Sequence, residues 1–285
     1  MRKTKILVTI GPSSSKENVI LRLIREGVDG FRLNFSHGTH EEKRKIIQII
    51  RKFEEKLKQG IPIIGDLQGP VIRIGEIDDL CVHRGDTVYL IYGKKGDSEN
   101  KKIPIPNEDA FAMIDENDLI LIESGRIIIR ADEIIDNEIR GTVLLDGVIK
   151  SEKTFAIKGK DIPLPTLSEK DIEDVKFCVE NDLDYIGLSF VRDSTDVVGL
   201  RELLEEFGKP EIKIISKIET KQAVENIHGI LKRSDAILVA RGDLAIYYDL
   251  ERIPEIQQYL IRESRAHGKP SIVAVSYTHL TLPTT

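Results

Sequence analysis

A lysine and a glutamate two residues apart close an apolar run in the second half of this 285-residue chain. The run is Ile214-Ile215-Ser216-Lys217-Ile218-Glu219, and its richness in isoleucine predicts a buried strand. Side chains alternate between the two faces of a strand, so Lys217 and Glu219 should share one face at its carboxyl end. A cation and a carboxylate placed together in this way suit a phosphate and a metal ion.

Polar and charged residues also follow the other predicted strands. They are Arg32, Asn34 and Ser36 after the second strand, Asp66 after the third, Ser189 and Arg192 after the fourth, and Arg241 and Asp243 after the sixth. Any one of them is equally consistent with an ordinary polar loop residue. Together they predict a site, because charges that are buried or half-buried require partners.

The residue types narrow the chemistry of this site. Glu219 and Asp243 offer the carboxylate oxygens that Mg²⁺ prefers. Arg32, Arg73 and Lys217 suit phosphate, Arg by paired donation and Lys as a point charge. Phosphoryl transfer needs this combination, because its catalysis is mostly positioning and charge stabilisation. The spacing therefore predicts an enzyme that uses a metal ion and a phosphate, without naming the substrate.

The elements that must position these residues alternate between strand and helix. Strands are predicted at residues 5–10, 28–33, 61–66, 184–189, 211–217, 235–240 and 271–275. Gly27 and the pairs Thr39–Glu42 and Ser168–Asp171 are capping signals for the helices between them. Short buried strands alternating with helices predict a parallel sheet. The repeat length and strand count favour an α/β fold with a (β/α)8 TIM-type barrel, incomplete at about seven strands, over an open doubly wound sheet.

The alternation of strands and helices stops between residues 71 and 164. Short alternating runs at 87–92, 119–123, 126–130 and 138–145 are separated by Asn, Gly, Asp and Pro, which is typical of a compact all-β module. The predicted organisation has four parts. These are a first barrel segment at 1–70, an inserted all-β domain at 71–164, a second barrel segment at 165–274, and a tail at 275–285.

Composition excludes several classes of protein. A formal net charge of −6 does not suggest a nucleic-acid binder. Cys81 and Cys178 lie far apart and form no disulfide framework or paired metal motif, which fits a reducing compartment. The apolar run after Met1 is too short for a signal peptide or a membrane span, so we expect a cytoplasmic protein without a membrane partner. His228 and His279 lie away from the strand ends and support no site prediction.

Seven segments resemble, in family order, motifs of the pyruvate kinase family, and the resemblance runs from the N-terminus to about Ala274. The first three are the opening segment, Thr4-Lys5-Ile6 together with Thr9-Ile10-Gly11-Pro12-Ser13-Ser14, then Arg32-Leu33-Asn34-Phe35-Ser36-His37-Gly38 and Asp66-Leu67-Gln68-Gly69-Pro70-Val71-Ile72-Arg73. The later ones are Leu167-Ser168-Glu169-Lys170-Asp171, Ser189-Phe190-Val191-Arg192, Ser216-Lys217-Ile218-Glu219 and Ala240-Arg241-Gly242-Asp243-Leu244.

The resemblance implies transfer of a phosphoryl group from phosphoenolpyruvate to ADP, giving pyruvate and ATP in the last step of glycolysis. It implies Mg²⁺ (or Mn²⁺) at Glu219 and Asp243, and phosphoenolpyruvate at Arg32, Lys217, Asp243 and the Gly242 backbone. The catalytic residues would be Lys217, Arg32 and Arg73, and the nucleotide would face Asn34, His37, Arg73 and Lys158. The β module would close over the site and exclude water. Full-length members of the family form homotetramers.

Potassium dependence does not follow from the resemblance. Asn34, Ser36, Asp66 and the Leu67 carbonyl occupy the family's K⁺ site. Leu67, Gln68 and Ile74 resemble a potassium-independent branch of the family, but that branch usually has a lysine where this chain has Val71. A valine cannot replace the charge of the ion, so both alternatives stay open.

The end of the chain departs from the family. Val275 stands where the family has a threonine that helps to protonate the enolpyruvate, and the residues after it resemble nothing in the family. We expect an eighth strand and a C-terminal oligomerisation and effector domain to be missing, with an open sheet edge and poor solubility as a result. Two alternatives therefore stand beside an active kinase. One is an inactive fragment, and the other is a different Mg²⁺-dependent phosphoenolpyruvate or pyruvate barrel enzyme, against which the inserted β module argues.

Overall fold

The chain divides into two compact units in the computed structural model, which describes residues 3–123, 125–135 and 137–275. The first unit consists of Met1–Pro70, Pro165–Ala240 and Gln257–Val275, and the second contains Val71–Leu164 together with Arg241–Ile256. The predicted division instead assigns residues 241–256 to the second barrel segment; the domain boundaries stay a prediction. The predicted tail lies outside the described residues apart from Val275. Among the described helices, none is long and apolar enough to cross a bilayer.

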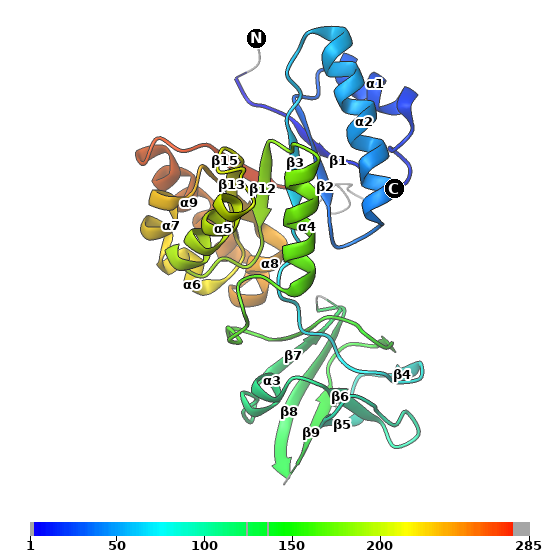
Figure 1. Ribbon diagram of the computed structural model, residues 1–285. Helices are drawn as coiled ribbons and strands as arrows, with labels where there is room; N and C mark the ends of the chain where they lie inside the picture. Colours follow the sequence, from blue (N-terminus) through cyan, green and yellow to red (C-terminus); the bar gives the residue numbers. More distant parts are fainter. Residues whose placement is uncertain (1–2, 124, 136, 276–285) are drawn as a thin grey trace, which may run out of the picture. The chain divides into compact units, whose positions relative to one another are not determined.

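The first unit is built on one parallel sheet of seven strands (Figure 1). Its strands are β1 (Leu7–Thr9), β2 (Gly30–Asn34), β3 (Ile63–Asp66), β12 (Tyr185–Leu188), β13 (Lys213–Ile218), β14 (Ala236–Ala240) and β15 (Ser271–Ala274). They are ordered β1-β2-β3-β12-β13-β14-β15, and no pairing joins β1 to β15 within the part of the chain that the structure describes. The predicted partial barrel of seven parallel strands is confirmed.

Helices connect these strands along the chain. They are α1 (Glu17–Arg25), α2 (His40–Leu57), α4 (Glu169–Glu180), α5 (Ser194–Glu206), α6 (Lys221–Glu225), α7 (Ile227–Arg233) and α9 (Ile253–Ala266), which begins in the second unit. The two predicted capping boxes are present, with Thr39 and Glu42 starting α2 and Ser168 and Asp171 starting α4. Gly27 follows α1 with a φ of 90°, a left-handed conformation that glycine adopts without strain.

Apolar side chains form a layer on one face of the barrel sheet. The layer contains Ile64, Ile215, Ala236, Leu238 and Ala240 on β3, β13 and β14, with Leu7, Tyr185 and Ile272 packed against them. Successive strand residues point to opposite faces, so Lys217, two residues after Ile215, lies on the same face as this layer. Apolar packing on that face therefore ends in a buried charge at the carboxyl end of β13.

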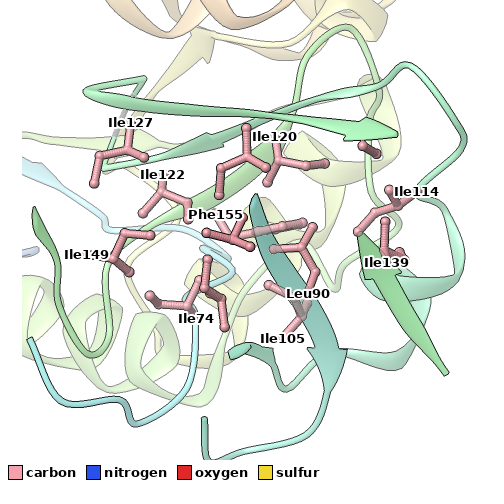
Figure 2. Close-up of a cluster of buried hydrophobic side chains, with 14 of the residues drawn as sticks. Ile74, Leu90, Ile105, Ile114, Ile120, Ile122, Ile127, Ile139, Ile149 and Phe155 are labelled. Atoms are coloured by element: carbon pink, nitrogen blue, oxygen red, sulfur yellow. The ribbon is translucent and has the colours of Figure 1, made fainter. Parts of the chain in front are cut away.

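The second unit is a β domain with a core of its own. Its strands are β4 (Leu80–Val82), β5 (Thr87–Tyr92), β6 (Lys102–Ile105), β7 (Leu119–Ile122), β8 (Ile127–Ile135), β9 (Glu138–Val143), β10 (Gly147–Ile149) and β11 (Phe155–Ile157). They form a six-stranded sheet, ordered β11-β7-β8-β9-β5-β6, and a β10-β4 pair. Figure 2 shows that Ile74, Leu90, Ile122 and Phe155 point into one apolar cluster, which explains the alternating pattern read from the sequence.

The inserted domain differs from the all-β prediction in one element. A short helix, α3 (Glu108–Ala112), follows β6, and the Asn107 side chain caps it by accepting from the backbone N–H of Ala110 at 2.7 Å. The alternation rule missed this helix because it is too short to show a helical period. The unit also contains the helix α8 (Arg241–Tyr247) and a 3₁₀ turn, Leu250–Arg252.

Candidate active site

Four predicted site residues form a row of alternating charges at the carboxyl ends of β2, β3 and β13 in the barrel unit. Arg32 on β2 donates from Nε to Asp66 Oδ2 at 2.9 Å. The other oxygen of Asp66 lies 3.3 Å from Lys217 Nζ, and Lys217 Nζ lies 2.9 Å from Glu219 Oε1. The row therefore runs cation, carboxylate, cation, carboxylate, so each buried charge has a partner of opposite sign.

Strand register brings these residues together. Asn34 pairs with Asp66 across β2 and β3, and Asp66 pairs with Gly187 across β3 and β12. Gly187 leaves room for the carboxylate, since a Cβ at this position would stand 2.9 Å from Asp66 Oδ1. Lys217, one strand further along, can then reach Asp66.

Lys217 is the most enclosed cation of the row, with a side chain 10% exposed. Its ammonium donates to Ser189 Oγ at 2.7 Å as well as facing the two carboxylates. Burial by itself would lower the pKa of Lys217, but the charges of Glu219 and Asp66 outweigh it, and the pKa lies above its ordinary value of 10.5. Lys217 is therefore a fixed cation at neutral pH and not a base.

Glu219 directly follows β13 and is held from two sides. Its Oε2 accepts from the backbone N–H of Phe190 at 2.7 Å, while Oε1 faces Lys217. Phe190 adopts a φ of 53°, which is rare for a bulky side chain and is found mostly at functional sites. The strained turn after β12 therefore helps to orient the predicted metal ligand.

Three of the four predicted potassium ligands have protein partners at the oxygens that an ion would use. Asn34 Oδ1 accepts from the Ser36 N–H at 2.8 Å. Asp66 faces Arg32 and Lys217 through its carboxylate, and the Leu67 carbonyl accepts from the Ser189 hydroxyl at 2.6 Å. Carbonyl and carboxylate oxygens keep a second lone pair after accepting one hydrogen bond, so K⁺ at this set stays a prediction.

Other predicted residues do not join the charged row. His37 is exposed on the loop after β2, and its carbonyl accepts from Lys43 Nζ at 2.6 Å. Arg192 pairs with Asp196, with Nη2 3.0 Å from Oδ1. Both contacts are structural, so a role for His37 in nucleotide binding stays a prediction.

The remaining predicted residues belong to the second unit. Arg73 donates to the Glu152 carbonyl at 2.8 Å, and Lys158 lies 3.4 Å from Asp249. Arg241, Gly242 and Asp243 form the first turn of α8 instead of a loop after β14. Their roles in the site stay predictions.

Two residues near the row were not found by the sequence analysis. Thr9 Oγ1 accepts from Arg32 Nη1 at 2.9 Å, and Phe190 donates its backbone N–H to Glu219. Thr9 could have been found, because it closes the first strand as the other site residues close theirs. Phe190 could not, because its contribution is a backbone group whose direction depends on an unusual φ.

Comparisons with known proteins identify a family. A family model described as the barrel domain of pyruvate kinase matches residues 1–280. The pyruvate kinase of Thermococcus litoralis is 35% identical over 274 residues, which are 95% of this chain and 57% of that protein. The enzyme of Chlamydia muridarum is 38% identical over 277 residues, again 95% of this chain and 57% of that protein. The Staphylococcus aureus (strain MRSA252) enzyme is 37% identical over 278 residues, which are 96% of this chain and 47% of that protein.

A solved structure agrees with these matches. The crystal structure of pyruvate kinase from Pyrobaculum aerophilum superposes with a TM-score of 0.88 at 32% sequence identity. The match covers 96% of this chain and 61% of that one. The chain thus spans about half the length of the curated relatives it matches.

Proposed function

Because the chain belongs to the pyruvate kinase family, we propose that it carries the site at which a phosphoryl group passes from phosphoenolpyruvate to ADP. The observation that supports this most directly is the row Arg32–Asp66–Lys217–Glu219 at the carboxyl ends of β2, β3 and β13. It supplies two cations for a phosphate and a buried carboxylate for a metal ion.

Lys217 and Arg32 are the residues assigned to the moving phosphate. Lys217 is held in place by Ser189, Asp66 and Glu219, so it need not reorganise when charge moves during transfer. Arg32 is 30% exposed, which leaves part of its guanidinium open to a ligand. In the proposal, the Gly242 backbone contributes to the same substrate, and Asn34, His37, Arg73 and Lys158 contact the nucleotide.

Glu219 and Asp243 are the proposed ligands of Mg²⁺ or Mn²⁺. Two carboxylates offer the hard oxygen donors that these ions take, and the rest of the shell is filled by water and substrate oxygens. When bound, the ion would neutralise charge on the phosphoryl oxygens. Because Leu67, Gln68 and Ile74 resemble the potassium-independent branch of the family, the proposal includes activity that does not require K⁺.

Several further statements follow from the family and are part of the proposal. They are a place in glycolysis, a cytoplasmic location, and assembly as a homotetramer in a full-length protein. The inserted β domain would serve as a lid that excludes water from the reacting phosphate.

The experiment measures pyruvate formation from phosphoenolpyruvate and ADP by the purified chain with Mg²⁺, with and without K⁺. Lys217→Ala should lower kcat by about 10²–10³-fold, because it removes a preorganised charge from the transition state. The matched control is Lys213→Ala on the same strand, where the side chain is 54% exposed and faces Asp235 at 3.8 Å. This control should keep wild-type turnover.

Circular dichroism and phosphoenolpyruvate titration calorimetry separate loss of chemistry from loss of fold. A folded wild-type chain that neither binds phosphoenolpyruvate nor forms pyruvate would contradict the proposal for this chain. Full turnover by folded Lys217→Ala would contradict the role of Lys217. A strict requirement for K⁺ would contradict only the proposal that activity does not depend on K⁺.

A further inference from the structure

A second cluster of chemically capable residues lies on the helices of the barrel unit, away from the charged row. It consists of His228 on α7, Glu263 on α9, and His267 directly after α9. Each offers a ligand atom within 4.8 Å of those of the other two. His228 Nδ1 lies 3.7 Å from Glu263 Oε2, and the two imidazole rings have centroids 5.5 Å apart.

We propose that His228, Glu263 and His267 form a Zn²⁺ site. Two imidazoles and one carboxylate make up a known zinc ligand set that leaves a fourth position for water. Imidazole nitrogens favour Zn²⁺ over Mg²⁺, which prefers oxygen ligands alone. The site is thus chemically distinct from the carboxylates assigned to Mg²⁺, and it does not depend on the proposed reaction.

The tautomer of His267 supports the assignment. Its Nδ1 lies 2.8 Å from the backbone carbonyl oxygen of Glu263, so Nδ1–H donates and Nε2 keeps its lone pair. Metal-bound histidines commonly make this contact with a backbone carbonyl through the nitrogen that does not bind the metal. Glu263 and His267 are four residues apart, the spacing that places two side chains on one face of a helix.

The distances need only a small adjustment to accept an ion. Ligand bonds of about 2.0–2.1 Å place the corners of a tetrahedral zinc site roughly 3.4 Å apart. The contact of 3.7 Å between His228 and Glu263 is already close to this. His228 is 59% exposed and can rotate, whereas Glu263 is 18% exposed and more confined. Arg262 Nε lies 3.7 Å from the other carboxylate oxygen of Glu263, so it leaves Oε2 to the ion.

Zinc at this cluster would tie α7 to α9. The first helix precedes β14 and the second precedes β15, so the ion would link the connections on either side of β14. A ligand that binds only the folded state stabilises it by mass action. Zinc should therefore raise the melting temperature of the chain.

The test is Zn²⁺ titration calorimetry on the full chain in saturating Mg²⁺, with thermal melts in parallel. Wild type should bind Zn²⁺ stoichiometrically and melt at a higher temperature with it. His228→Gln and His267→Gln should each weaken binding by about tenfold or more and reduce the shift in melting temperature accordingly. The matched control is His83→Gln, which changes a histidine 77% exposed beside Asp146 in the second unit and should bind as wild type does.

The visible absorption spectrum of Co²⁺ is a second measurement of binding. Co²⁺ bound by two imidazoles and a carboxylate absorbs visible light, whereas the aquo ion absorbs weakly. His228→Gln changes an exposed side chain, so it should remain folded, and loss of the cobalt spectrum in this variant would support the site. Absence of Zn²⁺ binding to wild type would overturn the proposal. Equal binding by wild type, His228→Gln and His267→Gln would overturn it as well.

Discussion

Asp66 joins two cations that come from different strands of the barrel sheet. Its carboxylate accepts from Arg32 and faces Lys217, and it stands directly against the backbone of Gly187. The position of Asp66 therefore sets the positions of both proposed phosphate-binding residues. A displacement of about 1 Å at such a centre can cost about 10²-fold in rate.

Gly187→Ala tests this dependence. The new methyl group would lie 2.9 Å from Asp66 Oδ1, so the carboxylate must shift. We expect kcat to fall by about 10–10²-fold, with a loss of about 1–3 kcal/mol in the free energy of unfolding. Steady-state kinetics and urea denaturation measure the two effects. Gly199→Ala is the control, because a Cβ there meets nothing within 4 Å, and unchanged kinetics in both variants would contradict the prediction.

At the scale of elements, α5 is anchored by a buried carboxylate near its first turn. Asp196 accepts from the Arg192 backbone N–H at 2.8 Å and from the Arg192 side chain, and the Thr166 hydroxyl also donates to it. Burial alone would raise the pKa of Asp196, but these donors outweigh it and the pKa lies below its ordinary value of 3.8. The charged form therefore stabilises the turn between β12 and α5.

Asp196→Asn should lower the free energy of unfolding by about 1–3 kcal/mol at neutral pH. Because the pKa is depressed on folding, the contribution of Asp196 is present above pH 3.8 and is lost as the pH falls through the folded pKa. The difference in unfolding free energy between wild type and variant should therefore disappear in acid. Urea denaturation at several pH values measures it. Asp193→Asn is the control, since asparagine caps a helix as well as aspartate does. A difference in unfolding free energy that stays constant down to the pH of acid unfolding would contradict a stabilising role for charged Asp196.

At the scale of the whole molecule, each compact unit contains one cysteine. Cys81 is exposed on β4, and Cys178 is buried on α4 against Gly65, where an added Cβ would stand 2.5 Å from its sulfur. Burial raises the pKa of the Cys178 thiol, and the thiolate is the reactive form. The two cysteines therefore report on the two units separately.

A thiol reagent should label one cysteine of the native chain and both after denaturation. Cys81→Ser should abolish native labelling and leave Cys178 to report the unfolding of the barrel unit. Mass spectrometry of the labelled protein counts the modified sites. Equal labelling rates for Cys81 and Cys178 under native conditions would show that the core around α4 is open.

The sequence by itself determined the fold class and the family. Strand alternation predicts the strands and the shared face of Lys217 and Glu219, and capping pairs predict where α2 and α4 begin. These features depend on near neighbours in the chain, so their spacing is visible in the residue order. The motifs around Arg32, Asp66 and Lys217 carried the resemblance to pyruvate kinase for the same reason.

Only the tertiary structure decided which charges pair. Sheet order brings Asp66 to Lys217, 151 positions later in the chain, and leaves room for it through Gly187. The helix α3, the φ of Phe190 and the approach of His228 to Glu263 and His267 were likewise absent from the prediction. Each depends on a short element, a single backbone angle or two helices meeting in space. Contacts between distant residues are set by how elements pack, and residue spacing along one chain does not contain that information.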